Sequence, residues 1–198
     1  HHNDSNDPLL RQIFPIAQEL ELHDAYQKDP LNEDDALSQP GLLQKYHGRA
    51  LLLVTPTCAI NCRYCFRRHY PYDNKGHLWK QIDNNIALIQ NDLSIEEVIL
   101  SGGDPLSLSD DKIAELIEKL EQISHLKRIR IHTRFPIVDP KRVTAKLINL
   151  LSQSHLKVAT IFRLYWLSRC RKVRQRSEFG STVGERNYLL RQIRFSIS

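Results

Sequence analysis

The 198-residue chain has no methionine, no long apolar run and no secretory leader pattern. A helix that crosses a bilayer needs about 20 consecutive apolar residues, and a leader needs a basic start, an apolar core and a small-residue cleavage site. The sequence therefore favours neither a membrane protein nor an exported one, and we expect a cytoplasmic location with no membrane partner. Because the chain contains no methionine, we also expect its true N-terminus to be missing.

Cysteine is scarce, and three of the four cysteines lie within eight residues: Cys58, Cys62 and Cys65. Clustered thiols in a chain without an export signal bind metal or do redox chemistry more often than they form disulfides. The segment 58–65, here called the cysteine loop, has no fourth thiol nearby. Its soft, charged thiolates suit an iron–sulfur cluster. A zinc site that adds His69 to the three thiols is the alternative. Cys170 is distant in the sequence, and we assign it no role.

The basic excess belongs to one end of the chain. The formal charge is +5, but residues 163–198 hold eight arginines and one lysine against two glutamates, which gives +7. Residues 1–162 hold 19 basic and 21 acidic side chains, which gives −2. A basic tail can bind nucleic acid, or it can be a segment that does not fold with the rest. We expect no nucleic-acid partner for the domain itself.

Hydrophobic patterning predicts alternating strands and helices after residue 49. Apolar segments predict strands at 50–54, 98–100 and 156–162, and alternation of polar and apolar residues predicts one at 128–133. Helical spacing predicts a helix at 78–91, one capped by Ser109 or Asp110, and one capped by Asp139 with Val143, Leu147, Leu150 and Leu151 facing inward. This alternation is typical of an α/β fold with a parallel sheet, in which functional groups collect at the carboxyl ends of the strands.

We expect three segments. Residues 1–49 form an N-terminal helical extension, which Pro15 interrupts and in which residues 29–41 make an acidic surface connection. Residues 50–162 form the strand–helix domain. Residues 163–198 show no clean period and form an atypical basic tail, either frameshifted or disordered.

Polar motifs follow three successive predicted strands. They are the cysteine loop, the Gly-Gly-Asp-Pro turn at 102–105 and the pair Thr133-Arg134. Glycines let the backbone approach a ligand closely, and a carboxylate accepts charge-assisted hydrogen bonds from an ammonium group. The turn alone is also typical of an ordinary strand-to-helix connection. Because the carboxyl ends of parallel strands meet at one edge of a sheet, we expect the three motifs to lie together.

The spacing C-x3-C-x2-C, with an aromatic residue before the last cysteine, resembles the signature of the radical S-adenosylmethionine (SAM) superfamily. The resemblance implies a [4Fe–4S] cluster on the three cysteines, with SAM bound at the open iron. It implies SAM contacts from Tyr64, Ser101, Gly102, Gly103, Asp104, Thr133 and Arg134. An internal salt bridge is the alternative role for Arg134. The implied fold is a partial (βα) TIM-like barrel of about four strand–helix units.

Residues 40–50, 62–68, 100–105 and 130–136 together resemble the lysine 2,3-aminomutase family. Residues 7–12 and 62–72 favour the branch that makes β-lysine for modification of elongation factor P. The family implies that a radical from SAM acts on free lysine bound to pyridoxal 5′-phosphate, and that the amino group migrates from the α- to the β-carbon. It also implies an electron donor such as flavodoxin or ferredoxin, and it allows a homo-oligomer.

The family resemblance extends to single residues. Arg67 matches the arginine that binds the substrate carboxylate, and Tyr46 and Arg49 match residues around pyridoxal phosphate. Lys45 stands where relatives can carry arginine. The pyridoxal lysine of the family lies beyond this chain, so no lysine here is assigned that role. We expect a truncated chain that is inactive alone, with a frameshift or a truncated gene model near residues 159–163, which translation in the other reading frames would test. Another radical SAM enzyme and a zinc-binding interaction module are the alternative functions.

Overall fold

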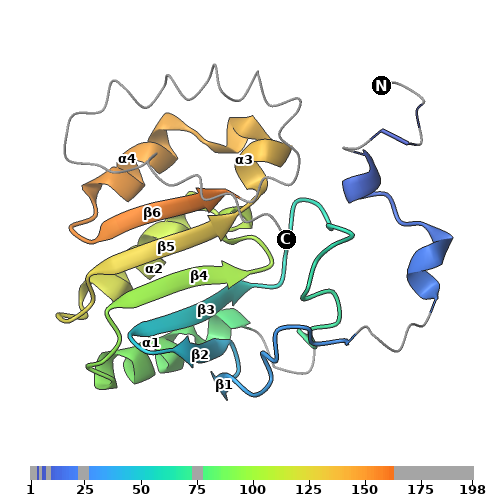
Figure 1. The fold of residues 1–198 in the computed structure, drawn as a ribbon. Coiled ribbons are helices and arrows are strands. Elements are labelled where there is room, and N and C mark those ends of the chain that lie inside the picture. The colour runs from blue at the N-terminus through green and yellow to red at the C-terminus, as the bar shows by residue number, and fades with distance from the viewer. Residues whose placement is uncertain (1–3, 5, 8–9, 22–26, 73–77, 163–198) are drawn as a thin grey trace.

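The computed structural model describes residues 4, 6–7, 10–21, 27–72 and 78–162. These residues contain a six-stranded sheet in which the strands lie in sequence order (Figure 1). The strands are β1 (Leu37–Gln39), β2 (Leu42–Tyr46), β3 (Arg49–Thr55), β4 (Glu97–Gly102), β5 (Arg128–Thr133) and β6 (Lys157–Phe162). Strands β3 to β6 pair in parallel, as predicted. Within the described residues β1 and β6 are the outer strands, so the sheet is open, as a partial barrel requires.

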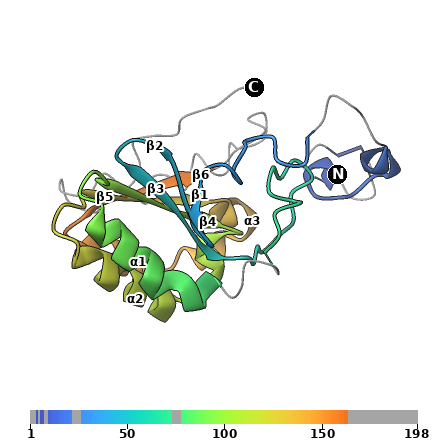
Figure 2. The same cartoon turned by 90° about the horizontal axis from the view of Figure 1, so that it is seen from below.

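Helices connect the parallel strands. Helix α1 (Ile82–Asn91) follows β3, α2 (Asp110–Glu121) follows β4, and both α3 (Phe135–Val138) and α4 (Ala145–Gln153) follow β5. The short 3-10 helices are η1 (Leu10–Gln12), η2 (Ala17–Leu20), η3 (Leu78–Gln81), η4 (Pro105–Ser107) and η5 (Pro140–Arg142). Figure 2 shows α1 and α2 side by side on one face of the sheet.

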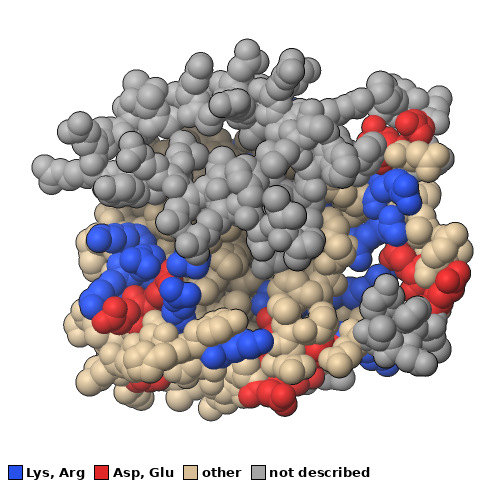
Figure 3. Space-filling model, viewed as in Figure 1, with Lys and Arg blue, Asp and Glu red and all other residues tan. Residues whose placement is uncertain are grey.

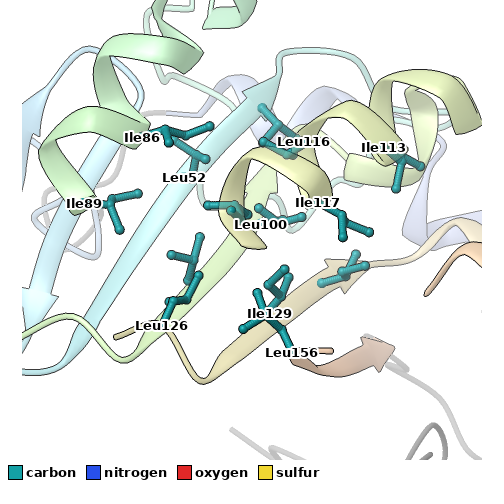
Figure 4. Packing of buried hydrophobic residues seen from close by; sticks show 14 of the residues in the cluster. Leu52, Ile86, Ile89, Leu100, Ile113, Leu116, Ile117, Leu126, Ile129 and Leu156 are labelled. Carbon is teal, nitrogen blue, oxygen red and sulfur yellow. The ribbon is translucent and has the colours of Figure 1, made fainter. Parts of the chain in front are cut away.

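The main hydrophobic core lies between the sheet and helices α1, α2 and α4. Alternate residues of the central strands point into it and are almost fully buried: Leu52, Val54, Val98, Leu100, Ile129 and Ile131. The helices contribute Ile82, Ile86, Ile89, Ile113, Leu116, Ile117, Leu120, Leu147 and Leu151. Figure 4 shows part of this packing. Burial of one such side chain contributes about 1.5–3 kcal/mol, so this layer holds the ends of β3, β4 and β5 in fixed positions.

Local sequence signals set the start of α2. The Ser109 hydroxyl accepts a hydrogen bond from the Lys112 backbone N–H at 3.3 Å, so Ser109 is the cap. Asp110 and Asp111 lie in the first turn, where a carboxylate interacts favourably with the helix dipole. Both the predicted capping region and the predicted apolar face are confirmed.

The N-terminal region is less helical than predicted. Its described residues form the short helices η1 and η2, but residues 37–46 form strands β1 and β2. Strand β2 pairs antiparallel with β3, and this pairing buries Leu42 and Leu43. The expected boundary between residues 49 and 50 therefore falls inside a β-hairpin. The helical expectation for this part is wrong because burial of the two leucines extends the sheet.

The helix expected after Asp139 is divided in two. The Asp139 side chain caps η5, and the Thr144 hydroxyl caps α4 by accepting a backbone hydrogen bond at 3.1 Å. Val143 lies between the two caps and is 40% exposed, so its predicted inward position is wrong. The inward prediction is confirmed for the buried Leu147 and Leu151, whereas Leu150 is only partly buried.

Residues 163–198, the predicted basic tail that includes Cys170, lie outside the described residues. The frameshift and disorder expected there stay predictions. In the part of the chain that the structure describes, none of the helices combines the length and the apolar character needed to cross a bilayer.

Candidate functional site

Three strand ends meet at one edge of the sheet. Strand β3 leads into the cysteine loop, β4 into the Gly-Gly-Asp-Pro turn, and β5 into Arg134. The first two ends are joined by backbone hydrogen bonds from the Gly103 N–H to the Thr55 carbonyl at 2.6 Å and from the Asp104 N–H to the Thr57 carbonyl at 2.8 Å. The three motifs therefore lie together, as their positions after successive strands predict.

The two glycines of the turn permit this contact because they carry no side chain. A Cβ atom on Gly103 would lie 2.2 Å from the Thr57 carbonyl oxygen. A Cβ atom on Gly102 would lie 2.3 Å from the Thr55 carbonyl oxygen. Gly102 also has a φ of 124°, which other residues rarely adopt. The glycines thus hold the turn against the chain that enters the cysteine loop. Their contact with SAM stays a prediction.

We expect Gly103→Ala to lower the free energy of unfolding by about 3 kcal/mol, because the neighbouring Thr57 oxygen belongs to the backbone and cannot rotate aside. Gly48→Ala is the matched control. Gly48 has a φ of 76°, but its Cβ would meet only the Ser94 carbonyl oxygen, at 3.6 Å. The control should lose about 1 kcal/mol through backbone strain. Urea unfolding measures both losses, and equal losses would argue against the Thr57 contact.

Asp104 connects the ends of β4 and β5. Its carboxylate is buried and accepts four hydrogen bonds. Oδ1 accepts from the Thr133 hydroxyl at 2.6 Å and the Leu106 N–H at 3.0 Å. Oδ2 accepts from the backbone N–H groups of Arg134 at 2.7 Å and Phe135 at 3.0 Å. Asp104 and Thr133 were predicted to contact SAM, but in this structure both carboxylate oxygens serve to join two strand ends.

The cysteine loop carries its three thiols beside these strand ends. Cys58 is exposed, whereas Cys62 and Cys65 are partly buried. The surrounding protein raises the pKa of the Cys58 thiol to about 11. Although the residue as a whole is exposed, partial removal of its thiol from water is the largest cause of this raised pKa, and the negative charges of Asp104, Cys65 and Cys62 act in the same direction. The three thiols are therefore close enough to influence one another electrostatically.

This donor set suits a cationic cluster. Desolvation and nearby negative charge oppose the thiolate form of Cys58, and bound iron ions would stabilise that form. Among the residues that the structure describes, no group of three or more His, Cys, Asp or Glu side chains is arranged to hold a metal ion. A [4Fe–4S] cluster thus fits the donors, but the loop would have to draw its sulfur atoms together. The same finding applies to the alternative zinc site with His69, whose side chain is exposed.

Arg134 links the cysteine loop to the N-terminal region. Its Nη1 donates to the Cys62 sulfur at 2.8 Å, and its Nη2 donates to the side-chain oxygen of Gln12. Its guanidinium carbon lies 5.2 Å from the centre of the Tyr64 ring, within cation–π range. In the described part of the chain Arg134 therefore has a thiol, an amide and a ring as partners, and not the salt bridge considered as its alternative role. The SAM contacts of Arg134 and Tyr64 stay predictions.

Glu19 holds helix η2 against the cysteine loop. Its carboxylate pairs with Arg63 and, at 3.0 Å, with Arg68. The Ile16 backbone N–H also donates to it, at 3.1 Å. Burial acts to raise the pKa of Glu19, but the hydrogen bonds from Ile16, Arg63 and Arg68 together lower it.

The contact between Glu19 and the cysteine loop should therefore weaken in acid. A carboxyl group whose pKa falls on folding adds stability above its unfolded pKa, and this stability is lost as the pH falls through the folded pKa. Because the pKa of Glu19 is lowered, we expect this stability to be lost at pH values below the usual glutamate pKa. During a pH titration, the side-chain NMR signals of Arg63 and Arg68 should change as the Glu19 carboxylate becomes protonated. Glu19→Gln should remove this pH-dependent change. If the signals still change with pH in that variant, another titrating group causes the change.

Arg67 is enclosed beside the Gly-Gly-Asp-Pro turn. Its Nε and Nη2 donate to the two carboxylate oxygens of Glu33, both at 2.6 Å. Its Nη1 donates to the Ser101 hydroxyl at 2.8 Å and to the Gly102 carbonyl at 3.5 Å. Arg67 and Glu33 are 6% and 8% exposed. The sequence predicts that Arg67 binds the carboxylate of a substrate, and in this structure the chain itself supplies a carboxylate to it.

Glu33 is the residue of this site that sequence analysis missed. It lies in the stretch expected to be a surface connection, which also contains Asp29, Asp34 and Asp35. Within residues 27–35 only Glu33 is buried. Nothing in the sequence distinguishes it from its acidic neighbours, because its burial depends on a guanidinium 34 residues further along the chain.

Tyr46 and Arg49 lie at the opposite end of β3 from the cysteine loop. They pair with each other across the β2–β3 hairpin, and Tyr46 is exposed. Arg49 forms an ion pair at 2.9 Å with the buried Glu97, which also pairs with Arg130 at 2.6 Å. Figure 3 shows basic and acidic side chains gathered over this end of the parallel strands. The structure does not bring these two predicted pyridoxal phosphate contacts together with the cysteines.

The described residues therefore do not form a pyridoxal phosphate site beside the cysteine loop. Lys45, the third residue considered near the phosphate, donates from Nζ to the Leu31 carbonyl at 2.6 Å.

Comparison with known proteins relates these motifs to a family. Residues 52–175 match the radical SAM superfamily. The chain is 46% identical over 159 residues to a Buchnera aphidicola protein named L-lysine 2,3-aminomutase, an alignment that covers 80% of this chain and 47% of the relative. It is 43% identical over 157 residues to the Escherichia coli protein of that name, covering 79% and 45%. A Clostridium subterminale protein of that name is 40% identical over 154 residues, covering 77% and 37%. The chain thus spans about half the length, or less, of these curated relatives.

Proposed function

Because the chain belongs to the radical SAM superfamily, we propose that Cys58, Cys62 and Cys65 hold a [4Fe–4S] cluster that acts on SAM. The observation that carries this proposal is that the glycine turn is held against the end of β3, which leads into the cysteine loop: the Gly103 N–H donates to the Thr55 carbonyl at 2.6 Å. When bound, such a cluster supplies an electron for the cleavage of SAM.

The chain's own residues bind and orient these cofactors in the proposed site. Arg134 donates to the Cys62 sulfur at 2.8 Å, and hydrogen bonds to sulfur are one means by which a protein adjusts a cluster's reduction potential. Asp104 holds the Arg134 backbone through a 2.7 Å hydrogen bond. The proposed surroundings of SAM are Tyr64, Ser101, Gly102, Gly103, Asp104, Thr133 and Arg134.

We further propose that the substrate is lysine and that the reaction, an isomerisation, moves its amino group from the α- to the β-carbon. Similarity to proteins named L-lysine 2,3-aminomutase supports this substrate and reaction. Arg67 would bind the lysine carboxylate. Its planar guanidinium suits this role because two parallel hydrogen bonds match the carboxylate geometry, and it makes such a pair with Glu33.

The finer parts of the proposal rest on the family resemblance. They are the supply of β-lysine for modification of elongation factor P, pyridoxal 5′-phosphate as a further cofactor, an electron donor such as flavodoxin or ferredoxin, and a homo-oligomer. A cytoplasmic location is proposed from the lack of a secretory leader pattern in the sequence. Tyr46 and Arg49 stay the predicted pyridoxal phosphate contacts.

A product assay on the complete gene product tests the proposal. The protein is reconstituted anaerobically with iron and sulfide and then incubated with lysine, SAM, pyridoxal 5′-phosphate and a reductant. Chromatography should detect β-lysine. Cleavage of SAM without β-lysine would overturn the substrate and favour another radical SAM enzyme. Bound zinc without labile sulfide would overturn the cluster and favour a zinc-binding module.

A further inference from the structure

The buried pair Glu33–Arg67 joins a firmly held arginine to a largely exposed segment of the N-terminal region. The Arg67 guanidinium is fixed by the Ser101 hydroxyl at 2.8 Å and lies 4.7 Å from the centre of the Phe66 ring. Glu33 belongs to residues 27–36, here called the strap, in which it is the single buried residue. Several hydrogen bonds of the strap stay within it, such as that from the Ala36 N–H to the Glu33 carbonyl at 3.2 Å. The strap is also held to β2, by hydrogen bonds from the Lys45 Nζ to the Leu31 carbonyl at 2.6 Å and from the Gln44 N–H to the Ala36 carbonyl at 2.9 Å. Release of Glu33 would therefore free the strap only in part.

We propose that Glu33 occupies a carboxylate-binding site centred on Arg67 and thereby determines its specificity. A ligand enters only if its own carboxylate takes over both hydrogen bonds that Arg67 now donates at 2.6 Å. This inference rests on the proposed function where it takes the natural ligand to be lysine. The role of Arg67 in binding a ligand carboxylate also belongs to the proposed function, and what the observed pair adds is that Glu33 occupies this position.

Exchange of one carboxylate for another leaves the charge of Arg67 compensated. A buried charge that loses its partner is strongly destabilising, so Arg67 does not open to water without a substitute. When a ligand carboxylate enters, Arg67 keeps two charge-assisted hydrogen bonds while Glu33 moves into water. An amide offers one acceptor oxygen and no charge, and an amine offers the wrong charge. Glu33 therefore selects ligands with a free carboxylate.

Chemical rescue of Glu33→Ala tests the site directly. The variant removes the carboxylate from Arg67 and should have a lower Tm than the wild type. Sodium propionate should restore the Tm with a saturating concentration dependence, because a ligand that binds only the folded state stabilises it. The wild type should respond far less, and sodium chloride at equal ionic strength controls for salt. The double variant with Arg67→Ala should not respond. The absence of a propionate-specific response in Glu33→Ala would overturn the inference.

Lysine and its amide separate this inference from the proposed function. If L-lysine raises the Tm of Glu33→Ala and L-lysinamide does not, both are supported. If propionate acts and L-lysine does not, the carboxylate site stands and lysine as its ligand is contradicted. If no carboxylate acts, the inference fails, whereas the radical SAM assignment is unaffected.

Glu33→Gln provides a second variant in case Glu33→Ala does not fold. Glutamine keeps the side-chain volume and one acceptor but loses the charge. Amide hydrogens of residues 27–36 should exchange about tenfold faster than in the wild type, the effect of losing roughly one charge-assisted hydrogen bond. Asp35→Asn, at an exposed position of the same stretch, should leave the exchange unchanged. Equal exchange in Glu33→Gln and the wild type would overturn the role of Glu33.

Discussion

Cys62→Ala should abolish the brown colour of the anaerobically reconstituted protein and reduce its bound iron and sulfide to near zero. In the proposed site each of three thiolates holds one iron, so loss of the middle ligand leaves two thiolates that cannot retain the cluster. Cys62 also accepts the 2.8 Å hydrogen bond from Arg134, so the variant removes both a ligand and the link to the end of β5. Visible absorbance and chemical analysis of iron and sulfide per chain measure the effect.

Cys170→Ala is the matched control for this experiment. It makes the same substitution at a cysteine that the sequence places outside the proposed site, so colour, iron and sulfide should all be retained. Circular dichroism establishes that both variants fold. Retention of iron and sulfide by folded Cys62→Ala would contradict the assignment of this thiol as a ligand.

Asp104→Ala should lower the free energy of unfolding by about 4 kcal/mol. The carboxylate accepts from the Thr133 hydroxyl and from three backbone N–H groups, at 2.6–3.0 Å. A buried donor that loses its acceptor costs about 1–3 kcal/mol, and several are affected together, so the total lies at the upper end for a single substitution. The variant should also loosen the end of β5, because Arg134 loses its backbone anchor. Urea unfolding measures the loss.

Asp111→Ala is the control for Asp104→Ala. The Asp111 side chain is 88% exposed and pairs with Lys146 at 3.1 Å, and exposed ion pairs contribute about 0–1 kcal/mol. This variant should therefore unfold at nearly the same urea concentration as the wild type. If the two variants lose similar amounts of stability, Asp104 does not join the strand ends in the way its hydrogen bonds indicate.

The parts of the fold that the sequence predicts well are those governed by neighbours along the chain. Strand β5 has the predicted bounds, Arg128–Thr133, because apolar and polar residues alternate along it. Helix α2 carries its own cap and an apolar face at helical spacing. Strand β2 was missed because its stability comes from pairing with β3. The start of α4 is not predicted correctly because Asp139 and Thr144 can each cap a helix. In the folded chain Asp139 caps the short helix η5, and Thr144 caps α4.

The candidate site also has features that the sequence predicts and features that it does not. The sequence predicts which motifs meet, since each follows a parallel strand and such strands end at one edge of the sheet. It does not predict what their side chains contact. Asp104 accepts from the Arg134 backbone N–H, and Arg67 binds Glu33, through pairs separated by 30 and 34 residues. Arg49 was grouped with the other site residues from the resemblance, yet it lies at the start of β3 beside Glu97.

By itself the sequence determined the thiol spacing, the glycine turn and the strand–helix alternation that set the family and the α/β class. These features depend on residues a few positions apart, whose geometry follows from covalent distance and helical or strand period. Only the tertiary structure decided that Glu33 is buried against Arg67 and that Asp104 joins two strand ends. A buried charge is stable only beside a partner, and which of several acidic side chains becomes that partner depends on how the folded chain brings distant segments together.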